Sequence, residues 1–174
     1  DQGWIDGIKV TDTHEKNGVI YHETEAPIAV GTEVKGELDY KERFSRMQQH
    51  TGEHMLSGII HRLYGYDNVG FHLGAAETTM DFNGELTPEQ VREVETLANQ
   101  AVWDNIPVEI LYPTKEELAS MDYRSKIEIE GQVRIVRIGD VDMCACCAPH
   151  VSRTGEVGMI KVISCDRHRG GCRI

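Results

Sequence analysis

The sequence predicts an α+β fold with a mostly antiparallel sheet and two main helices, preceded by a small β-rich appendage. Short strand segments with turn residues between them fill residues 1–42. Two longer segments then carry apolar residues at helical spacing. The later strand segments do not alternate regularly with helices, which favours an antiparallel sheet over a parallel βαβ arrangement.

The appendage, residues 1–42, is expected to contain three strands, at 4–10, 19–24 and 32–38. The dipeptide Asn17-Gly18 lies between the first two and suits a tight hairpin turn. Three short strands are more plausible as an appendage than as an independent domain. Residues 43–174 are expected to form the main domain.

The first main helix is expected from about Lys41 to the glycine at position 65, a residue type that often ends helices. The second begins at Thr87-Pro88, where a capping box with Gln90 and a proline at the first helical position coincide. A short third helix is expected to open at Thr114, because Glu117 completes another capping box. Strands are expected at 69–73, 78–82, 108–112, 133–138 and 157–163.

Composition limits the classes of protein that this chain could represent. Its 174 residues carry a formal net charge of −11, which argues against extensive contact with nucleic-acid phosphates and against DNA as a partner. No segment resembles a membrane span or a secretion leader, so no membrane partner is expected and the cytoplasm is the expected compartment. The five cysteines are odd in number, which makes a disulfide framework unlikely.

Two spaced pairs of residues indicate metal chemistry. His50 and His54 lie four apart on the first helix, so their side chains share a face. Cys146 and His150 would add a thiolate and a third imidazole, a tetrahedral set that suits zinc. The pairs lie far apart in the chain, so the whole fold must assemble the site, as in a catalytic rather than a structural zinc centre. Cys144 and Cys147 could each replace Cys146 as the ligand.

Glu53 allows a second interpretation of the same helix. The string from His50 to His54 matches the inverted zinc-protease motif, in which the glutamate acts as the general base. That interpretation leaves Cys146 and His150 unexplained and needs an acidic third ligand that no local motif identifies. Glu53 is also the candidate base of any other hydrolase at this site, although a solvated carboxylate on the helix surface is an equal alternative.

Several motifs in order along nearly the whole chain resemble the alanyl-tRNA editing proteins of the AlaX type, relatives of the editing domain of alanyl-tRNA synthetase. The motifs are His50-Thr-Gly-Glu-His54, Asn68-Val-Gly-Phe-His-Leu-Gly74, Met80-Asp-Phe82, Leu86-Thr-Pro-Glu89, Asn105-Ile-Pro-Val108, Val133-Arg-Ile-Val-Arg-Ile138, Cys146-Cys-Ala-Pro-His150 and Gly170-Gly-Cys-Arg-Ile174. The resemblance implies a threonyl/alanyl-tRNA synthetase editing-domain-like fold. It also implies that both ends are truncated, because the family's glycine-rich opening element is not seen and the sequence stops directly after the Arg-Ile element.

The resemblance implies a zinc-dependent hydrolase that cleaves the ester of mischarged tRNA(Ala), mainly Ser-tRNA(Ala) and also Gly-tRNA(Ala), by contacting the tRNA acceptor end. A second hydrolytic site is expected there because an alanine-sized pocket cannot strongly reject serine. Carried over by position, the zinc ligands are His50, His54, Cys146 and His150. The residues near the substrate would be Phe71, His72, Gly74 and Arg173. A zinc-stabilised tRNA-binding module without catalysis is the non-enzyme alternative.

The net acidity is unevenly distributed along the chain. Residues 150–174 contain five basic and two acidic side chains, a local balance of +3 that directly follows the predicted metal ligands. This segment is therefore a candidate contact for the charged end of a tRNA, with an ordinary solvated tail as the equal alternative.

Overall fold

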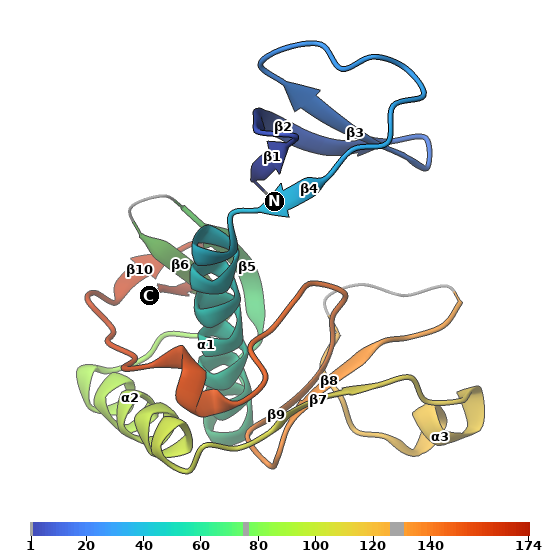
Figure 1. The fold of residues 1–174 in the computed structure, drawn as a ribbon. Coiled ribbons are helices and arrows are strands. Elements are labelled where there is room, and N and C mark those ends of the chain that lie inside the picture. The colour runs from blue at the N-terminus through green and yellow to red at the C-terminus, as the bar shows by residue number, and fades with distance from the viewer. Residues whose placement is uncertain (1, 75–76, 126–130) are drawn as a thin grey trace. The chain divides into compact units, whose positions relative to one another are not determined.

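The computed structural model describes residues 2–74, 77–125 and 131–174. The chain divides into two compact units, Asp1–Arg46 and Met47–Ile174. The described residues form three antiparallel sheets and three α-helices, so the predicted α+β class is confirmed (Figure 1). In this described part, no helix has the length and apolar character needed to cross a membrane.

The first unit contains one sheet in the order β3-β2-β1-β4. Its strands are β1 (Gly3–Ile5), β2 (Ile8–Lys16), β3 (Val19–Thr24) and β4 (Gly36–Leu38). The expectation of one strand over residues 4–10 is wrong, because Asp6-Gly7 forms a second tight turn with φ of 48° and 78°. The strand expected at 32–38 is shortened to Gly36–Leu38.

The second unit contains two antiparallel sheets. One has the order β10-β11-β6-β5, and the other has the order β7-β8-β9. Their strands are β5 (Asn68–Leu73), β6 (Thr78–Phe82), β7 (Val108–Leu111), β8 (Ile135–Ile138), β9 (Asp142–Ala145), β10 (Asp166–His168) and β11 (Gly171–Arg173). Strands β9, β10 and β11 were not expected from the sequence.

Helix α1 (Tyr40–Tyr64) is buried on all sides over residues 51–60. Leu56, Ile59 and Ile60 share a core cluster with β6, β11 and α2 (Pro88–Trp103), whereas Met55 belongs to a second cluster with Ile138 of β8. Polar side chains in the middle of such a buried helix need hydrogen-bond partners from the protein, because water cannot reach them. His54 and Glu53 lie in this buried stretch.

Both predicted capping boxes are present. Thr87 caps α2 with Gln90, and Thr114 caps α3 (Lys115–Ser120) with Glu117. Each pair satisfies two backbone N–H groups that the first turn of a helix leaves without an intrahelical partner.

The strand expected at 157–163 is wrong. Thr154–Val157 forms a 3-10 helix, and the chain runs without regular structure from there to β10. Side chains of α2 take the place of a strand partner: Asn99 bonds both the N–H and the C=O of Ile160, and Glu95 accepts from the N–H of Val162. The backbone is thus satisfied without a sheet.

Candidate metal centre

Helix α1 supplies the first two members of the site. His50 and His54 lie about one turn apart, and their rings are 4.9 Å apart in an edge-on arrangement. His54 is buried and His50 is half-buried. The predicted spacing thus places two imidazoles on one side of the helix.

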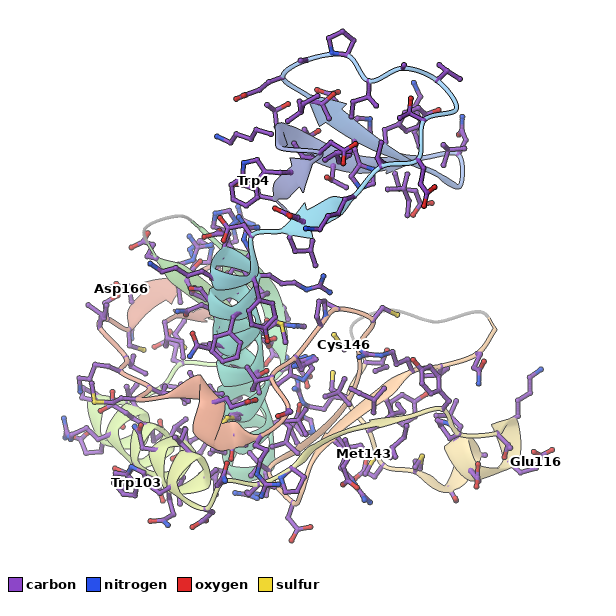
Figure 2. All side chains as sticks on the ribbon, in the orientation of Figure 1. Trp4, Trp103, Glu116, Met143, Cys146 and Asp166 are labelled. Atoms are coloured by element: carbon purple, nitrogen blue, oxygen red, sulfur yellow. The ribbon has the colours of Figure 1, made fainter. Side chains whose placement is uncertain are left out.

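The segment after β9 supplies the other two members, Cys146, which Figure 2 labels, and His150. Arg134, which precedes β8, holds this segment with two bonds from its side chain, to the carbonyl oxygens of Cys146 at 2.6 Å and Ala148 at 3.1 Å. The Arg134 carbonyl also accepts from the N–H of Cys146 at 3.0 Å. One arginine therefore fixes the backbone on which the thiol is carried.

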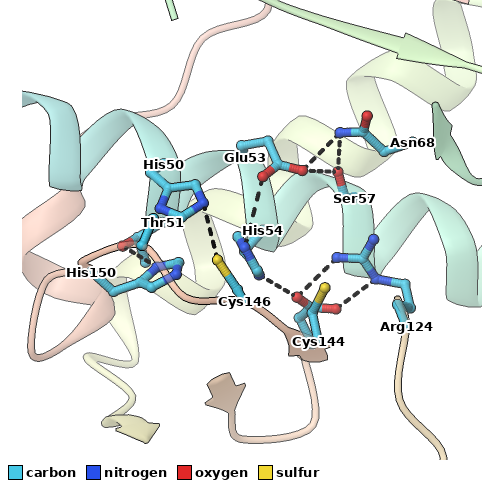
Figure 3. A network of polar contacts seen from close by, with 12 residues as sticks. His50, Thr51, Glu53, His54, Ser57, Asn68, Arg124, Cys144, Cys146 and His150 are labelled. Carbon is cyan, nitrogen blue, oxygen red and sulfur yellow. Dashed lines mark hydrogen bonds and ion pairs between the residues drawn. The ribbon is translucent and has the colours of Figure 1, made fainter. Parts of the chain in front are cut away.

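The structure brings all four predicted ligands together. One ligand atom from each of His50, His54, Cys146 and His150 lies within 4.8 Å of the others, a group that could hold a metal ion. The Cys146 sulfur is 3.6 Å from His50 Nε2, and Figure 3 marks this contact with a dashed line. The ring of His150 lies 4.2 Å from that of His50 and 4.6 Å from that of His54.

Each of the three imidazoles is oriented by a contact at its Nδ1 atom. Nδ1 of His50 lies 3.2 Å from the Pro149 carbonyl oxygen, Nδ1 of His54 lies 2.9 Å from Asp142, and Nδ1 of His150 lies 3.0 Å from the Thr51 hydroxyl. Each Nε2 is left for the interior of the cluster. This is the arrangement that orients histidines as metal ligands.

His150 Nε2 provides the direct test of whether these residues fit a metal. Among the described residues, it is the buried side-chain nitrogen without a hydrogen-bond partner. An unpaired buried polar atom costs about 1–3 kcal/mol. A metal bound at this nitrogen would remove that cost, so the residues fit a metal ion.

The charges of the cluster also favour a metal. Burial opposes ionisation of the Cys146 thiol, but the three neighbouring imidazoles stabilise the thiolate more than burial destabilises it, and they lower its pKa to about 3. Burial, together with the charges of the neighbouring histidines, lowers the pKa of His150 to about 4. A thiolate and a neutral imidazole are the forms in which these side chains bind metals.

Asp142 contacts Nδ1 of His54, the ring nitrogen that points away from the cluster, and Arg124 in turn binds Asp142. Asp142, at the start of β9, accepts from His54 and receives a two-bonded contact from Arg124, with distances of 2.8 and 2.9 Å. Burial disfavours charge on His54, yet its bonds to Asp142 and Cys146 outweigh burial and raise its pKa to about 9. A Cβ at Gly58 would overlap the carbonyl oxygen of Val141, so only glycine lets β9 approach the helix this closely.

Glu53 is buried rather than solvated. Its Oε1 accepts from Ser57 at 2.8 Å and from Asn68 at 2.7 Å, and its Oε2 lies 3.8 Å from His54 Nε2. The carboxylate is therefore held beside a ligand atom, in the interior of the protein. The inverted-protease interpretation loses its basis, because Cys146 and His150 complete the set without an acidic ligand.

The residues predicted near the substrate are only partly brought together. Phe71 of β5 stacks on His50, with ring centroids 5.9 Å apart. His72 is the next residue of the strand and points to the opposite face of the sheet, and Gly74 directly follows the last residue of the strand. Arg173 of β11 makes a two-bonded ion pair with Asp81, at 2.6 and 2.8 Å.

Three basic side chains of the C-terminal segment form ion pairs with carboxylates of the same chain. Lys161 pairs with Glu95 at 2.7 Å and Arg167 pairs with Glu85 at 3.0 Å, in addition to the pair of Arg173. These carboxylates neutralise three of the five basic side chains that made this segment a candidate tRNA contact.

Cys144 and Cys147, the two alternatives to Cys146 as the ligand, differ from it in environment. Cys147 is exposed, and burial raises the pKa of Cys144 to about 12.

The pKa values predict that the metal-free protein loses stability in acid. Between pH 6.5 and 4 the unfolded chain protonates both His150 and Cys146, whereas the folded chain protonates neither. His54 is protonated in the folded state over this range, and in the unfolded state it is only partly protonated near pH 6.5, so it opposes the fall in stability at that end of the range and no longer contributes at lower pH. The free energy of unfolding should therefore fall on acidification over this range. Urea unfolding in the presence of a chelator measures this, and a constant or rising stability on acidification would contradict it.

Comparison with known proteins gives the family context of this site. Residues 133–174 match the threonyl and alanyl tRNA synthetase second additional domain. The chain is 38% identical over 173 residues to alanyl-tRNA editing protein AlaX-L of Pyrococcus horikoshii, a match that covers 94% of this chain and 43% of that protein. The predicted resemblance to the alanyl-tRNA editing proteins is confirmed.

Two further relatives support the same resemblance. Alanyl-tRNA editing protein Aarsd1 of Mus musculus is 28% identical over 171 residues, which is 96% of this chain and 42% of that protein. An alanine–tRNA ligase of Halorubrum lacusprofundi is 31% identical over 172 residues, which is 94% of this chain and 19% of the ligase. The chain thus spans less than half the length of these relatives.

Sequence reasoning missed the residues that support the ligands, Thr51, Asp142 and Arg124, and those that hold Glu53, Ser57 and Asn68. Asn68 begins the motif Asn68-Val-Gly-Phe-His-Leu-Gly74, but its distance along the sequence from Glu53 does not indicate that the two residues are in contact. A β-bulge between Asn68 and Gly70 makes that contact compatible with the stacking of Phe71 on His50, because it lets both side chains face α1. A register shift of this kind is not visible in a hydrophobic pattern.

Proposed function

We propose that this chain is a trans-editing hydrolase that cleaves the aminoacyl ester of mischarged tRNA(Ala), with serine as its main and glycine as its second substrate. The observation that carries the proposal is the assembled set of three imidazoles and one thiolate. It occurs in a chain that is similar over 94% of its length to an alanyl-tRNA editing protein. We assign the activity to residues 43–174, predicted above as the zinc-containing editing domain.

The donor set supports zinc as the ion. One thiolate and three imidazoles match the tetrahedral nitrogen and sulfur coordination that zinc prefers, and His50, His54, Cys146 and His150 would hold it once His54 gives up its proton. When bound, zinc would supply Lewis-acid chemistry, which lowers the pKa of a water or polarises a carbonyl oxygen, after one protein ligand leaves or the coordination expands beyond four. The contacts of Asp142, Thr51 and Pro149 keep the imidazoles turned inward.

Glu53 is the residue that we propose as the proton acceptor for the attacking water. Ser57 and Asn68 fix its carboxylate through Oε1, and Oε2 lies beside His54. Phe71 would line the substrate side of the site through its stacking on His50. His72, Gly74 and Arg173 stay predictions that rest on the resemblance, with the acceptor end of the tRNA as their partner.

The test is deacylation of Ser-tRNA(Ala), Gly-tRNA(Ala) and Ala-tRNA(Ala) by the metal-loaded chain. We expect hydrolysis of the first two and none of Ala-tRNA(Ala), because a site built to bond the serine hydroxyl leaves polar groups unpaired when alanine enters. Glu53→Gln should lower kcat by about a hundredfold and remove the basic group from the pH profile. Its matched control is Glu85→Gln, an exposed carboxylate in an ion pair outside the site.

Two results would overturn the proposal. Binding of tRNA without hydrolysis of any of the three esters would favour the non-catalytic zinc-stabilised module. Cleavage of casein by the metal-loaded chain, without deacylation, would restore the protease alternative. An unchanged pH profile in Glu53→Gln, with metal content intact, would remove Glu53 from the mechanism and leave the ester assignment standing.

A further inference from the structure

A second group of metal-ligand side chains lies on the β2–β3 hairpin of the first unit. Asp12, His14 and Glu23 each offer one ligand atom, and these three atoms lie within 4.8 Å of one another. His14 Nδ1 is 3.0 Å from Asp12 Oδ2. All three side chains are exposed, so an ion from solution can reach them.

A β-bulge creates this group. The pairing register shifts between Val10 and Asp12, so that Asp12, and not Thr11, lies directly opposite Glu23. His14 lies two residues beyond Asp12 on the same strand and therefore on the same face. Bulges redirect side chains in this manner, and without the shift Glu23 would face a threonine.

The resulting arrangement has an electrostatic cost. Two carboxylates directly opposite each other on antiparallel strands repel and destabilise the pair of strands. His14 offsets this repulsion only when its imidazole is protonated. Its ring is stacked on Tyr21 of the neighbouring strand, with centroids 5.5 Å apart and planes 16° apart, so it is held close to the two carboxylates.

We propose that Asp12, His14 and Glu23 form a second metal site, which binds a divalent first-row transition cation such as Ni²⁺ or Zn²⁺. Two carboxylates and a neutral imidazole balance the charge of such an ion, and the imidazole selects it over Mg²⁺ and Ca²⁺, which take oxygen ligands. Ligand atoms about 2.1 Å from a tetrahedral ion are about 3.4 Å from one another. The three ligand atoms already lie within 4.8 Å of one another, so exposed side chains need to move only slightly to reach that separation. Water would complete the coordination.

Ni²⁺ is the probe for this site. The whole chain is first given one equivalent of Zn²⁺ to fill the centre at His50, and Ni²⁺ is then titrated by calorimetry. We expect one further site per chain in the wild-type protein and at least a tenfold weaker affinity in His14→Ala. His22→Ala is the matched control: His22 also lies on the hairpin and is exposed, but it points to the opposite face.

A second variant protects the test against misfolding. Asp12→Asn with Glu23→Gln keeps the shape of both side chains and removes the repulsion between them, so the hairpin should remain folded while Ni²⁺ affinity falls at least tenfold. Three results would overturn the proposal: no second binding event in the wild-type chain, full affinity in His14→Ala, or an equal loss in His22→Ala, which would indicate nonspecific binding to surface histidines.

Discussion

Replacing His54 by alanine should remove the bound metal and abolish deacylation of Ser-tRNA(Ala). The substitution deletes one of the four ligands and leaves Asp142 with Arg124 but without its imidazole partner. Loss of a residue that only orients a ligand typically costs 10–100-fold in metal affinity or activity, and loss of the ligand itself should exceed that range. Metal analysis of the purified protein and the deacylation rate under single-turnover conditions give the two readouts.

His61→Ala is the matched control for this experiment. His61 lies on the same helix seven residues later, but it is exposed and pairs with Asp67 at 2.9 Å, away from the metal set. Its replacement should leave metal content and deacylation unchanged. Full deacylation by a metal-free His54→Ala protein would contradict the assignment of the centre.

Asp142→Asn should destabilise the protein and weaken metal binding together. Asp142 is almost fully buried and is the counter-charge of both Arg124 and His54. Burial opposes ionisation of Asp142, but hydrogen bonds from His54 and Arg124 outweigh burial and keep its pKa below the usual value. An asparagine leaves a mostly buried guanidinium without a charged partner, which costs about 3–5 kcal/mol. Metal affinity should fall about 10–100-fold because His54 is no longer held in orientation.

Glu109→Gln separates this effect from a general loss of ion pairs. Glu109 pairs with Arg137 at 2.7 Å in the same sheet, but both side chains are about two-fifths exposed. An exposed pair contributes about 0–1 kcal/mol, so the stability of this variant should remain close to that of the wild type. Urea unfolding of the three proteins and zinc competition with a chromophoric chelator provide the comparison. Equal stability of Asp142→Asn and Glu109→Gln would show that the buried charge network is not needed for folding.

The elements with strong local signals could be predicted from the sequence. Apolar spacing identified α1, and capping residues located the starts of α2 and α3. The short strands could not be found in this way. Strands β10 and β11 have three residues each and pair through a turn with positive φ at Arg169 and Gly170, so neither is long enough for an alternating pattern.

The ligands were predictable because their spacing is a local property, whereas their supporting residues were not. His50 and His54 share a helix turn, and Cys146 and His150 share a short segment. Asp142 reaches His54 only because Gly58 lets β9 approach the helix, and Arg124 reaches Asp142 through a bridge to Cys144. Such contacts depend on the packing of distant segments. The sequence also offers the basic residues of 150–174 as a contact for the charged end of a tRNA, with a solvated tail as the equal alternative, but partners on α2 and β6 pair with Lys161 and Arg173.

The most direct test of the central claim is a metal titration of the deacylation reaction. Zinc is added in steps to the metal-free chain, and the rate of serine release from Ser-tRNA(Ala) is measured at each step, with Ala-tRNA(Ala) in parallel. We predict that the rate rises in proportion to zinc, reaches a plateau at one equivalent, and stays at background for Ala-tRNA(Ala). Full activity of the metal-free chain, or no activity at one bound equivalent, would contradict a metal-dependent editing centre at His50, His54, Cys146 and His150.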